Sequence, residues 1–365
     1  MKKALSIVLT LAMLFLLCAC GASTTTPPAT TDPGTTTEAE PAPAADGTVY
    51  TLRLATQVAQ PNPLANSAYR FAEKVAEATN GQVKIDVYPS NQLGDYTSVF
   101  EEMELGTIDL AWISADSSFD PMIDVQGIPY LFENWDQARE IWLNQEGFLF
   151  QTYKGAIEGY GAQNVTVMGV VPGGFLGICI NTDKFDQETL FDTSVSKDLL
   201  IRHPNMVVAR MIVEGLGFKS MALSWSELYN ALQTGVVDGA YGAGAGTVYT
   251  DLRDVSKYFV DYRYLMEMMA MMASTSSLDK LPEDLRQIVI DTAVAEQYDV
   301  FDEYEAFEKA GYKDLEDYGV TVIYPTDEQM ATLAASMRDK VWPGLDDVFT
   351  PEVMAGIRAQ VESLG

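Results

Sequence analysis

The sequence has few of the residues that carry most enzyme chemistry. It contains one histidine, His203, and three cysteines among 365 residues. A Ser-His-Asp triad would have to use His203, and no Gly-x-Ser-x-Gly nucleophile turn is present. Zinc sites normally combine His and Cys ligands. Walker-type phosphate loops and the Gly-x-Gly-x-x-Gly spacing of dinucleotide folds are also missing. We therefore expect no enzymatic activity, no cofactor and no metal site.

Positive charge is scarce as well. There are 23 Lys and Arg residues against 52 Asp and Glu residues, which gives a formal net charge of −29. Nucleic-acid binders need clustered Lys and Arg, because much of their affinity comes from neutralising phosphates. No basic stripe is present, so we expect no nucleic-acid partner, and the acidic balance indicates solubility.

The N-terminus has the pattern of a bacterial lipoprotein signal. Lys2 and Lys3 precede an apolar stretch that is too short to span a membrane. The following Leu-Cys-Ala-Cys-Gly segment is a lipobox pattern, which predicts a signal peptide over 1–19 and lipidation of Cys20. This places the mature protein outside the cytoplasm, anchored by lipid to the outer face of the cytoplasmic membrane. An ordinary secretory signal cut nearby is the alternative interpretation.

The segment from 20 to 47 is rich in Thr, Pro and Ala and cannot bury a core, so it is predicted to be a disordered tether. Cys179 is then the only cysteine of the folded part, inside the apolar run Leu-Gly-Ile-Cys-Ile. We expect Cys179 to be a small buried side chain, and the folded part to have no disulfide.

From about residue 48 the pattern alternates strands and helices. We expect strands at 51–55, 83–87, 108–113, 165–171, 177–181 and 236–241, and helices beginning at Asn66 or Ser67, at Tyr96, at Asn205, at Ser224 with a Ser224/Glu227 capping box, and at Pro282. Such alternation predicts a largely parallel sheet covered on both faces. The helix after Pro282 runs to about Ala310, roughly 43 Å, which is long enough to lie across two domains. The methionine cluster at 266–272 is predicted to be a core segment rather than a soft-metal site.

Seven short segments occur in an order that resembles one known family. They are SNQLGD at 90–95, GTIDL at 106–110, IPYLF at 128–132, IRHP at 201–204, SELY at 226–229, LQTGVVDG at 232–239 and KLPE at 280–283. Together they resemble the solute-binding proteins of tripartite ATP-independent periplasmic (TRAP) transporters, over about residues 51–326.

The resemblance implies an α/β fold of the periplasmic-binding-protein type, with two lobes, hinge strands and a long helix spanning both lobes. It implies a first lobe over 48–172, to which about 268–305 return, and a second over 173–267, to which about 306–365 return. The implied partners are a small organic acid ligand and the membrane subunits of a TRAP permease.

The resemblance also implies ligand-binding residues. The family's carboxylate anchor corresponds to Arg202, whose planar guanidinium can form two parallel hydrogen bonds with a carboxylate. The other positions carried over are Gln57, Ser114, Trp225, Tyr241 and Gly242. We further expect the glycines at 242, 244 and 246 to line the cleft with backbone, because glycine permits close approach.

Two departures from the family pattern bear on the ligand. No arginine lies between Arg139 and Arg202, where the family commonly has one. The family often has Asn-Pro after Val-Asp-Gly-x-Glu, whereas this chain has Tyr241-Gly242-Ala243-Gly244. Because both departures remove polar groups, we expect an organic anion with one carboxylate on a bulkier or more apolar body. Two alternatives stay open: a binding protein for an ATP-driven importer or a sensor, and an exported hydrolase that uses serine and acidic residues.

Overall fold

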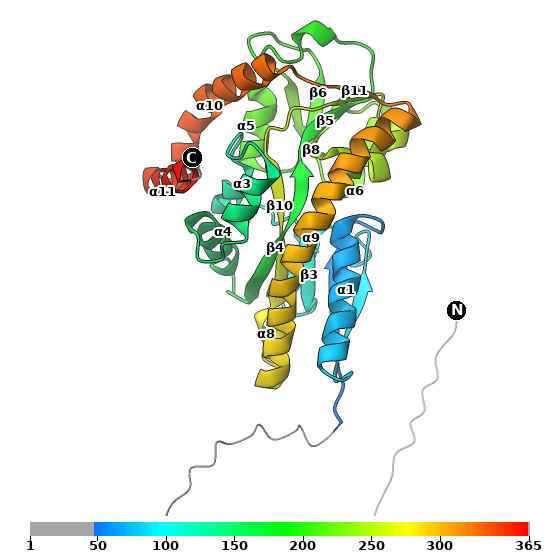
Figure 1. The fold of residues 1–365 in the computed structure, drawn as a ribbon, viewed down its shortest axis with the longest axis vertical. Helices are drawn as coiled ribbons and strands as arrows, with labels where there is room; N and C mark the ends of the chain where they lie inside the picture. Colours follow the sequence, from blue (N-terminus) through cyan, green and yellow to red (C-terminus); the bar gives the residue numbers. More distant parts are fainter. Residues whose placement is uncertain (1–46, 364–365) are drawn as a thin grey trace, which may run out of the picture. The chain divides into compact units, whose positions relative to one another are not determined.

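A computed structural model describes residues 47–363, which contain two mixed β-sheets with helices packed around them (Figure 1). The first sheet has the order β2-β1-β3-β10-β4 and the second the order β11-β9-β5-β8-β6-β7. The first is built from β1 (Tyr50–Thr56), β2 (Val83–Tyr88), β3 (Leu110–Ile113), β4 (Val165–Phe175) and β10 (Met266–Ser274). The second is built from β5 (Gly177–Ile180), β6 (Leu200–His203), β7 (Lys219–Ala222), β8 (Gly239–Ala243), β9 (Tyr258–Val260) and β11 (Thr321–Ile323).

The expectation of a largely parallel sheet is wrong for the strands that connect the two sheets. β10 runs antiparallel to both β3 and β4, and β5 runs antiparallel to both β8 and β9. The reason is the path of the chain. β4 leads through Leu176 directly into β5 of the second sheet, and β10 brings the chain back to the first sheet beside β4. A strand that returns beside an outgoing strand must run in the opposite direction.

The helices surround the two sheets (Figure 1). They are α1 (Pro63–Ala78), α2 (Tyr96–Glu104), α3 (Trp135–Trp142), α4 (Phe148–Glu158), α5 (Val207–Gly215), α6 (Trp225–Thr234), the short α7 (Ala245–Thr247) and α8 (Thr275–Leu278), α9 (Glu283–Tyr318), α10 (Asp327–Phe349) and α11 (Pro351–Glu362). A 3₁₀ segment, η1 (Pro121–Gly127), precedes α3. None of the helices in the described residues combines the length and apolar character needed to span a membrane.

The long helix α9 contacts both sheets and their neighbouring helices. It packs against α1, β4, α7 and β11, and Figure 1 shows it running from beside α1 and β4 towards β11. It has 36 residues and continues past the predicted end near Ala310 to Tyr318, where Gly319 terminates it at φ 105°. The helix therefore connects the two halves of the fold, as the two-lobed architecture requires.

Local capping signals account for some helix ends and not for others. The capping box of Ser224 and Glu227 opens α6, and Gly235 closes it in the left-handed conformation at φ 72°. The start predicted for α1 is wrong. Asn62, not Asn66 or Ser67, caps this helix, because its side chain accepts from Leu64 N and Pro63 suits the first turn.

The helix predicted to begin at Asn205 starts later, at Val207, and no side chain of its own N-terminal residues caps it. The cap comes from η1 instead. Asp124 Oδ2 accepts a hydrogen bond from Val208 N at 3.0 Å, and Asp124 is fully buried. A partner 84 residues away along the chain therefore sets this helix terminus.

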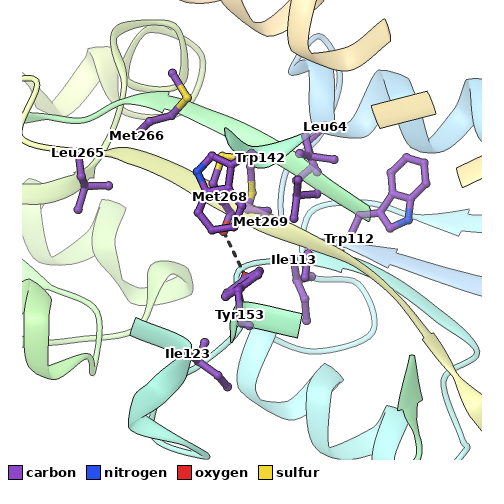
Figure 2. Packing of buried hydrophobic residues seen from close by; sticks show 14 of the residues in the cluster. Leu64, Trp112, Ile113, Ile123, Trp142, Tyr153, Leu265, Met266, Met268 and Met269 are labelled. Carbon is purple, nitrogen blue, oxygen red and sulfur yellow. Dashed lines mark hydrogen bonds between the residues drawn. The ribbon is translucent and has the colours of Figure 1, made fainter. Parts of the chain in front are cut away.

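The methionine-rich segment is part of the core, as predicted. It forms β10, whose methionines are buried. Figure 2 shows Met266, Met268 and Met269 among buried side chains such as Trp142, and the Tyr153 hydroxyl donates to Met268 O at 3.3 Å. Cys179 is likewise buried and free, in agreement with its prediction.

The C-terminal helices lie along one side of the fold. α10 packs against α5 and η1, and α11 packs against α4. The predicted lobe boundaries stay a prediction. The predicted signal peptide, the lipidation site Cys20 and the tether up to residue 46 lie outside the described residues.

Candidate functional site

A cavity lies where residues from both sheets come together, with an empty volume of about 730 Å³ that includes the solvent at its mouth. All six positions carried over from the sequence line it: Gln57, Ser114, Arg202, Trp225, Tyr241 and Gly242. They come from distant parts of the chain, since Gln57 follows β1, Ser114 follows β3 and Arg202 belongs to β6. Their role in binding a ligand stays a prediction.

Arg202 is a buried cation, only 2% exposed. Its Nε donates to Leu223 O at 2.8 Å and its Nη1 donates to Tyr241 O at 3.2 Å. The guanidinium carbon lies 5.8 Å from the centre of the Trp225 ring. Among residues 47–363, no acidic side chain forms an ion pair with Arg202, and no acceptor meets its Nη2. The protein therefore holds the guanidinium in place without neutralising it, although burial lowers the pKa of this group.

Gln57 and Ser114 form a short hydrogen-bonded chain that ends on Glu267. Gln57 Oε1 accepts from Ser114 N at 2.9 Å, and Gln57 Nε2 donates to Ser114 Oγ at 3.1 Å. Ser114 Oγ in turn donates to Glu267 Oε1 at 2.8 Å. Burial raises the pKa of Glu267 to about 6, and the Ser114 hydrogen bond and the charge of Arg202 oppose that rise.

Glu267 is a site residue that the sequence reasoning missed. It lies on β10 and lines the cavity, where its side chain is half-buried. One signal was available, because Glu267 is the only charged residue in the nine-residue strand MEMMAMMAS. An isolated acid within a buried apolar strand is costly unless it has a partner or a function.

A second group of polar residues on the cavity wall comes from three different helices, and the sequence reasoning missed it too. Asn62 Nδ2 donates to Thr247 Oγ1 at 3.3 Å and to the Tyr304 hydroxyl at 3.4 Å, and the Thr247 and Tyr304 hydroxyls are 3.2 Å apart. All three residues line the cavity, from the start of α1, from α7 and from α9. No local pattern relates these positions, which are up to 242 residues apart.

The aromatic wall rests on a pair of tyrosines. Tyr241 stacks on Tyr264 with ring centres 4.7 Å apart and an interplanar angle of 15°. The Tyr264 hydroxyl donates to Gly177 O at 3.0 Å and accepts from Gly242 N at 3.2 Å. Tyr264 thus contacts both the Tyr241 ring and the backbone of Gly242 and holds these two cavity-lining residues in place.

The glycines at 242, 244 and 246, which lie within β8 and directly after it, have two different structural roles. Gly242 lines the cavity at φ 112°, and a Cβ there would lie 3.3 Å from Arg202 Nη1. The expectation that Gly244 and Gly246 also line the cavity is wrong, because neither is among its lining residues. A Cβ on Gly246 would lie 2.5 Å from the Phe307 ring, and a Cβ on Gly311 would lie 2.3 Å from Gly246 N. This part of the run instead allows α9 to approach the backbone closely.

Asp238, in the segment that matched the family signature, fixes the neighbouring strands. Its Oδ2 accepts from Leu200 N at 2.9 Å and its N donates to Leu200 O at 2.8 Å. Its carbonyl oxygen accepts from Asn181 N at 2.8 Å. Asp238 therefore holds β6 beside β8, which places Arg202 at the cavity.

Within the described part of the chain, no group of three or more His, Cys, Asp and Glu residues is arranged to hold a metal ion. His203 Nδ1 lies 2.6 Å from Pro204 O, and burial lowers the pKa of its ring. These observations assign no metal role to His203.

The fold has two mixed β-sheets, a long helix that packs on both and a cavity lined by residues of both. This is the two-lobed architecture of solute-binding proteins. The sequence pattern of the bacterial extracellular solute-binding proteins of family 7 matches residues 54–343, and the chain belongs to this family, that of the TRAP solute-binding proteins.

Individual relatives agree with this assignment. The chain is 26% identical over 246 residues to the C4-dicarboxylate-binding periplasmic protein DctP of Rhodobacter capsulatus, covering 66% of this chain and 70% of that protein. Its fold is similar to a TRAP periplasmic solute-binding protein of Desulfovibrio salexigens, solved with orotic acid, at a TM-score of 0.76 and 21% identity; the match covers 87% of this chain and 100% of that one. It is also similar to the sugar acid binding protein DctPAm of Advenella mimigardefordensis, solved with galactonate, at a TM-score of 0.78 and 19% identity, over 88% and 100% of the two chains.

Proposed function

We propose that the chain is the extracytoplasmic solute-binding subunit of a TRAP-type secondary transporter, which captures an organic anion in its cavity and delivers it to the membrane permease. The observation that carries this proposal is Arg202, a buried guanidinium that forms no ion pair with any described residue. Burying an unpaired charge is costly, and a carboxylate ligand would remove that cost by pairing with it. In this proposal the protein binds its ligand without converting it.

The same cavity suggests what the ligand looks like. Arg202 is the only arginine among the lining residues, and Trp225, Tyr241, Leu176 and Met269 supply apolar surface. We therefore propose one carboxylate on a bulkier body, with Arg202 as the anchor. Gly242 would leave room for that body, and Gln57 and Ser114 would act mainly through Glu267, since their polar atoms bond to one another and to that carboxylate.

Two experiments test the proposal together. Native mass spectrometry of the protein as purified should identify a bound organic acid in one-to-one ratio. Protein stripped of that ligand should then gain about 2.7 kcal/mol at a ligand concentration one hundred times Kd, seen as a rise in melting temperature. A broad panel of carboxylates that produces no rise in stripped protein, or turnover of a carboxylate into product, would contradict it.

We also propose that lipid on Cys20 holds the protein to the outer face of the cytoplasmic membrane, on a tether that ends near residue 47. The support is the lipobox pattern before Cys20. Cys20→Ser should release the protein from washed membranes or block processing, and Cys18→Ser is the matched control that should leave anchoring unchanged. If the Cys20→Ser variant stays on washed membranes as fully as the parent, lipid anchoring through Cys20 is contradicted.

Finally, we propose that the two sheets belong to lobes that close over the ligand, with the first over 48–172 and about 268–305 and the second over 173–267 and about 306–365. The cavity residues that come from both sheets support this. Closure predicts that ligand slows amide hydrogen exchange at Ser114 and Arg202 together.

A further inference from the structure

The cavity holds two opposite charges that do not pair with each other. Arg202 comes from β6 of the second sheet, and Glu267 comes from β10 of the first. Neither forms an ion pair with any residue in the range 47–363. Each of the two groups also keeps one polar atom that has no partner in the described part of the chain, Nη2 of Arg202 and Oε2 of Glu267.

The hydrogen-bonded chain behind Glu267 indicates which protonation state the protein favours. The backbone N–H of Ser114 identifies the Gln57 atom that it meets as the oxygen, so the other Gln57 atom is the NH₂ group. That NH₂ group donates to Ser114 Oγ, which leaves the Ser114 hydrogen for Glu267 Oε1. Glu267 Oε1 therefore accepts a hydrogen bond, and this contact and the charge of Arg202 both favour the ionised form of Glu267.

Gly173 of β4 lies beside the second carboxylate oxygen of Glu267, Oε2. A Cβ on Gly173 of β4 would lie 2.6 Å from Glu267 Oε2, so any larger residue at Gly173 would displace it. Oε2 is not among the fully buried atoms that lack a partner, although no described residue donates to it. Because Glu267 lines the cavity, Oε2 is the oxygen that its described contacts leave for a donor on a ligand.

Charge balance then restricts the ligand. With Arg202 and Glu267 both ionised, the empty cavity is neutral overall. A simple carboxylate would pair with Arg202 and leave the Glu267 carboxylate without a charged partner in the cavity. A ligand that carries both a carboxylate and a cationic nitrogen would satisfy both protein groups and keep the cavity neutral.

We propose that the ligand is an amino carboxylate, whose carboxylate pairs with Arg202 and whose protonated nitrogen pairs with Oε2 of Glu267. This inference rests on the proposed function, in which Arg202 anchors a carboxylate, and adds a cationic nitrogen to that ligand. Glu267 is then the residue that distinguishes an amino acid from the same acid without its amine. Gln57 and Ser114 are positioning residues that hold Glu267 as an acceptor.

The test uses matched ligands on stripped protein by titration calorimetry. Each probe set consists of an amino carboxylate and the same acid with hydroxyl or hydrogen in place of the amine, for example phenylalanine, phenyllactate and 3-phenylpropanoate, or 5-aminopentanoate, 5-hydroxypentanoate and pentanoate. We expect an amino member of the panel to bind at least about tenfold more tightly than both analogues, because only the protonated amine makes a charge-assisted hydrogen bond with Glu267. Glu267→Gln, which keeps an acceptor for Ser114, should bring that ratio close to one.

Glu101→Gln is the control, because it removes an exposed carboxylate of α2 outside the cavity and should keep the preference. The inference is overturned if an analogue binds as tightly as its amino partner, or if Glu267→Gln, with an unchanged melting temperature, keeps the preference. Analogues that bind in an Arg202-dependent way, while amino members do not, overturn this inference and leave the proposed function standing. If no carboxylate of any probe set binds, both fail.

Discussion

Arg202 uses two of its nitrogens for the protein and leaves one for a ligand. Nε and Nη1 donate to backbone carbonyls of Leu223 and Tyr241, which belong to different segments of the second half of the fold. A lysine carries its three donors on one nitrogen, whereas the planar guanidinium holds Nε, Nη1 and Nη2 at separate, fixed positions. At the scale of the residue, the site therefore depends on the shape of the guanidinium as much as on its charge.

Arg202→Lys should weaken binding of the co-purified ligand by more than about tenfold, since a single ammonium nitrogen cannot replace Nε and Nη1 at their carbonyl partners and also take the place of Nη2. Titration calorimetry on stripped protein measures this. The control is Arg210→Lys, which changes an exposed arginine of α5 paired with Glu214 and should leave the affinity unaltered. Equal affinities for Arg202→Lys and wild type would show that Arg202 does not bind the carboxylate of the ligand.

Gly242 combines a backbone conformation with a close contact. Because its φ is 112°, an alanine there is strained, at a cost of about 1–3 kcal/mol, and its Cβ would also press on Arg202 Nη1. Gly242→Ala should therefore lower both the melting temperature and the affinity. Gly235→Ala is the matched control. It also has positive φ, at 72°, but a Cβ there meets nothing within 4 Å, so it should lower stability alone. An unchanged affinity in Gly242→Ala would place the ligand elsewhere.

At the scale of elements, the contact between α7 and α9 positions part of the cavity wall. Gly311 of α9 lies against the backbone of Gly246, and the same helix carries Tyr304, which bonds to Thr247 of α7 and to Asn62. Only glycine allows two backbones to approach so closely. The approach of α9 thus brings three polar residues of the cavity together.

Gly311→Ala should destabilise the fold by more than about 2 kcal/mol, because the new methyl group would overlap backbone atoms that have no room to shift. Chemical denaturation measures the effect. Gly155→Ala makes the same change in α4 at an exposed position with no neighbour within 4 Å, so it should be neutral or stabilise by up to about 1 kcal/mol. A Gly311→Ala variant as stable as wild type would contradict the close packing of Gly311 against the backbone of Gly246.

At the scale of the whole molecule, Glu308 of α9 joins the helix to the strand that connects the sheets. Its Oε2 accepts from Phe175 N, at the end of β4, at 2.6 Å. Burial raises the pKa of Glu308 to about 8, and nearby Asp261 and Glu305 add to the rise while Arg263 opposes it. The folded protein therefore holds a proton on Glu308 at neutral pH that the unfolded chain would release.

This difference predicts how stability depends on pH. Because the pKa of Glu308 is higher in the folded state, its contribution is fully present below about pH 4.5 and is lost as pH rises towards 8. Glu308→Gln should flatten the fall in unfolding free energy between pH 5 and 8 by about 1 kcal/mol or more, since each unit of pKa shift corresponds to about 1.4 kcal/mol. Urea denaturation at several pH values measures it, with Glu73→Gln on the exposed face of α1 as control. Parallel pH profiles for wild type and Glu308→Gln would contradict the shift.

Features that depend on neighbouring residues could be read from the sequence. The capping box of α6, its closing Gly235 and the apolar character of β10 were predicted correctly, because each results from interactions within a few residues or from composition. The family motifs located Arg202 at the end of a strand for the same reason. The sequence, with its family motifs, is therefore enough to predict the fold class and the six positions that line the cavity.

Contacts between distant segments could not be read in this way. Asp124 caps α5 from 84 residues away, β10 returns antiparallel beside β4, and Gly311 meets Gly246 through the packing of α9. Glu267 faces Arg202 only because β10 and β6 border the same cavity. Sequence patterns report the local preferences of the backbone, whereas these pairings result from how two sheets and a long helix pack, and that packing sets which charges share the cavity.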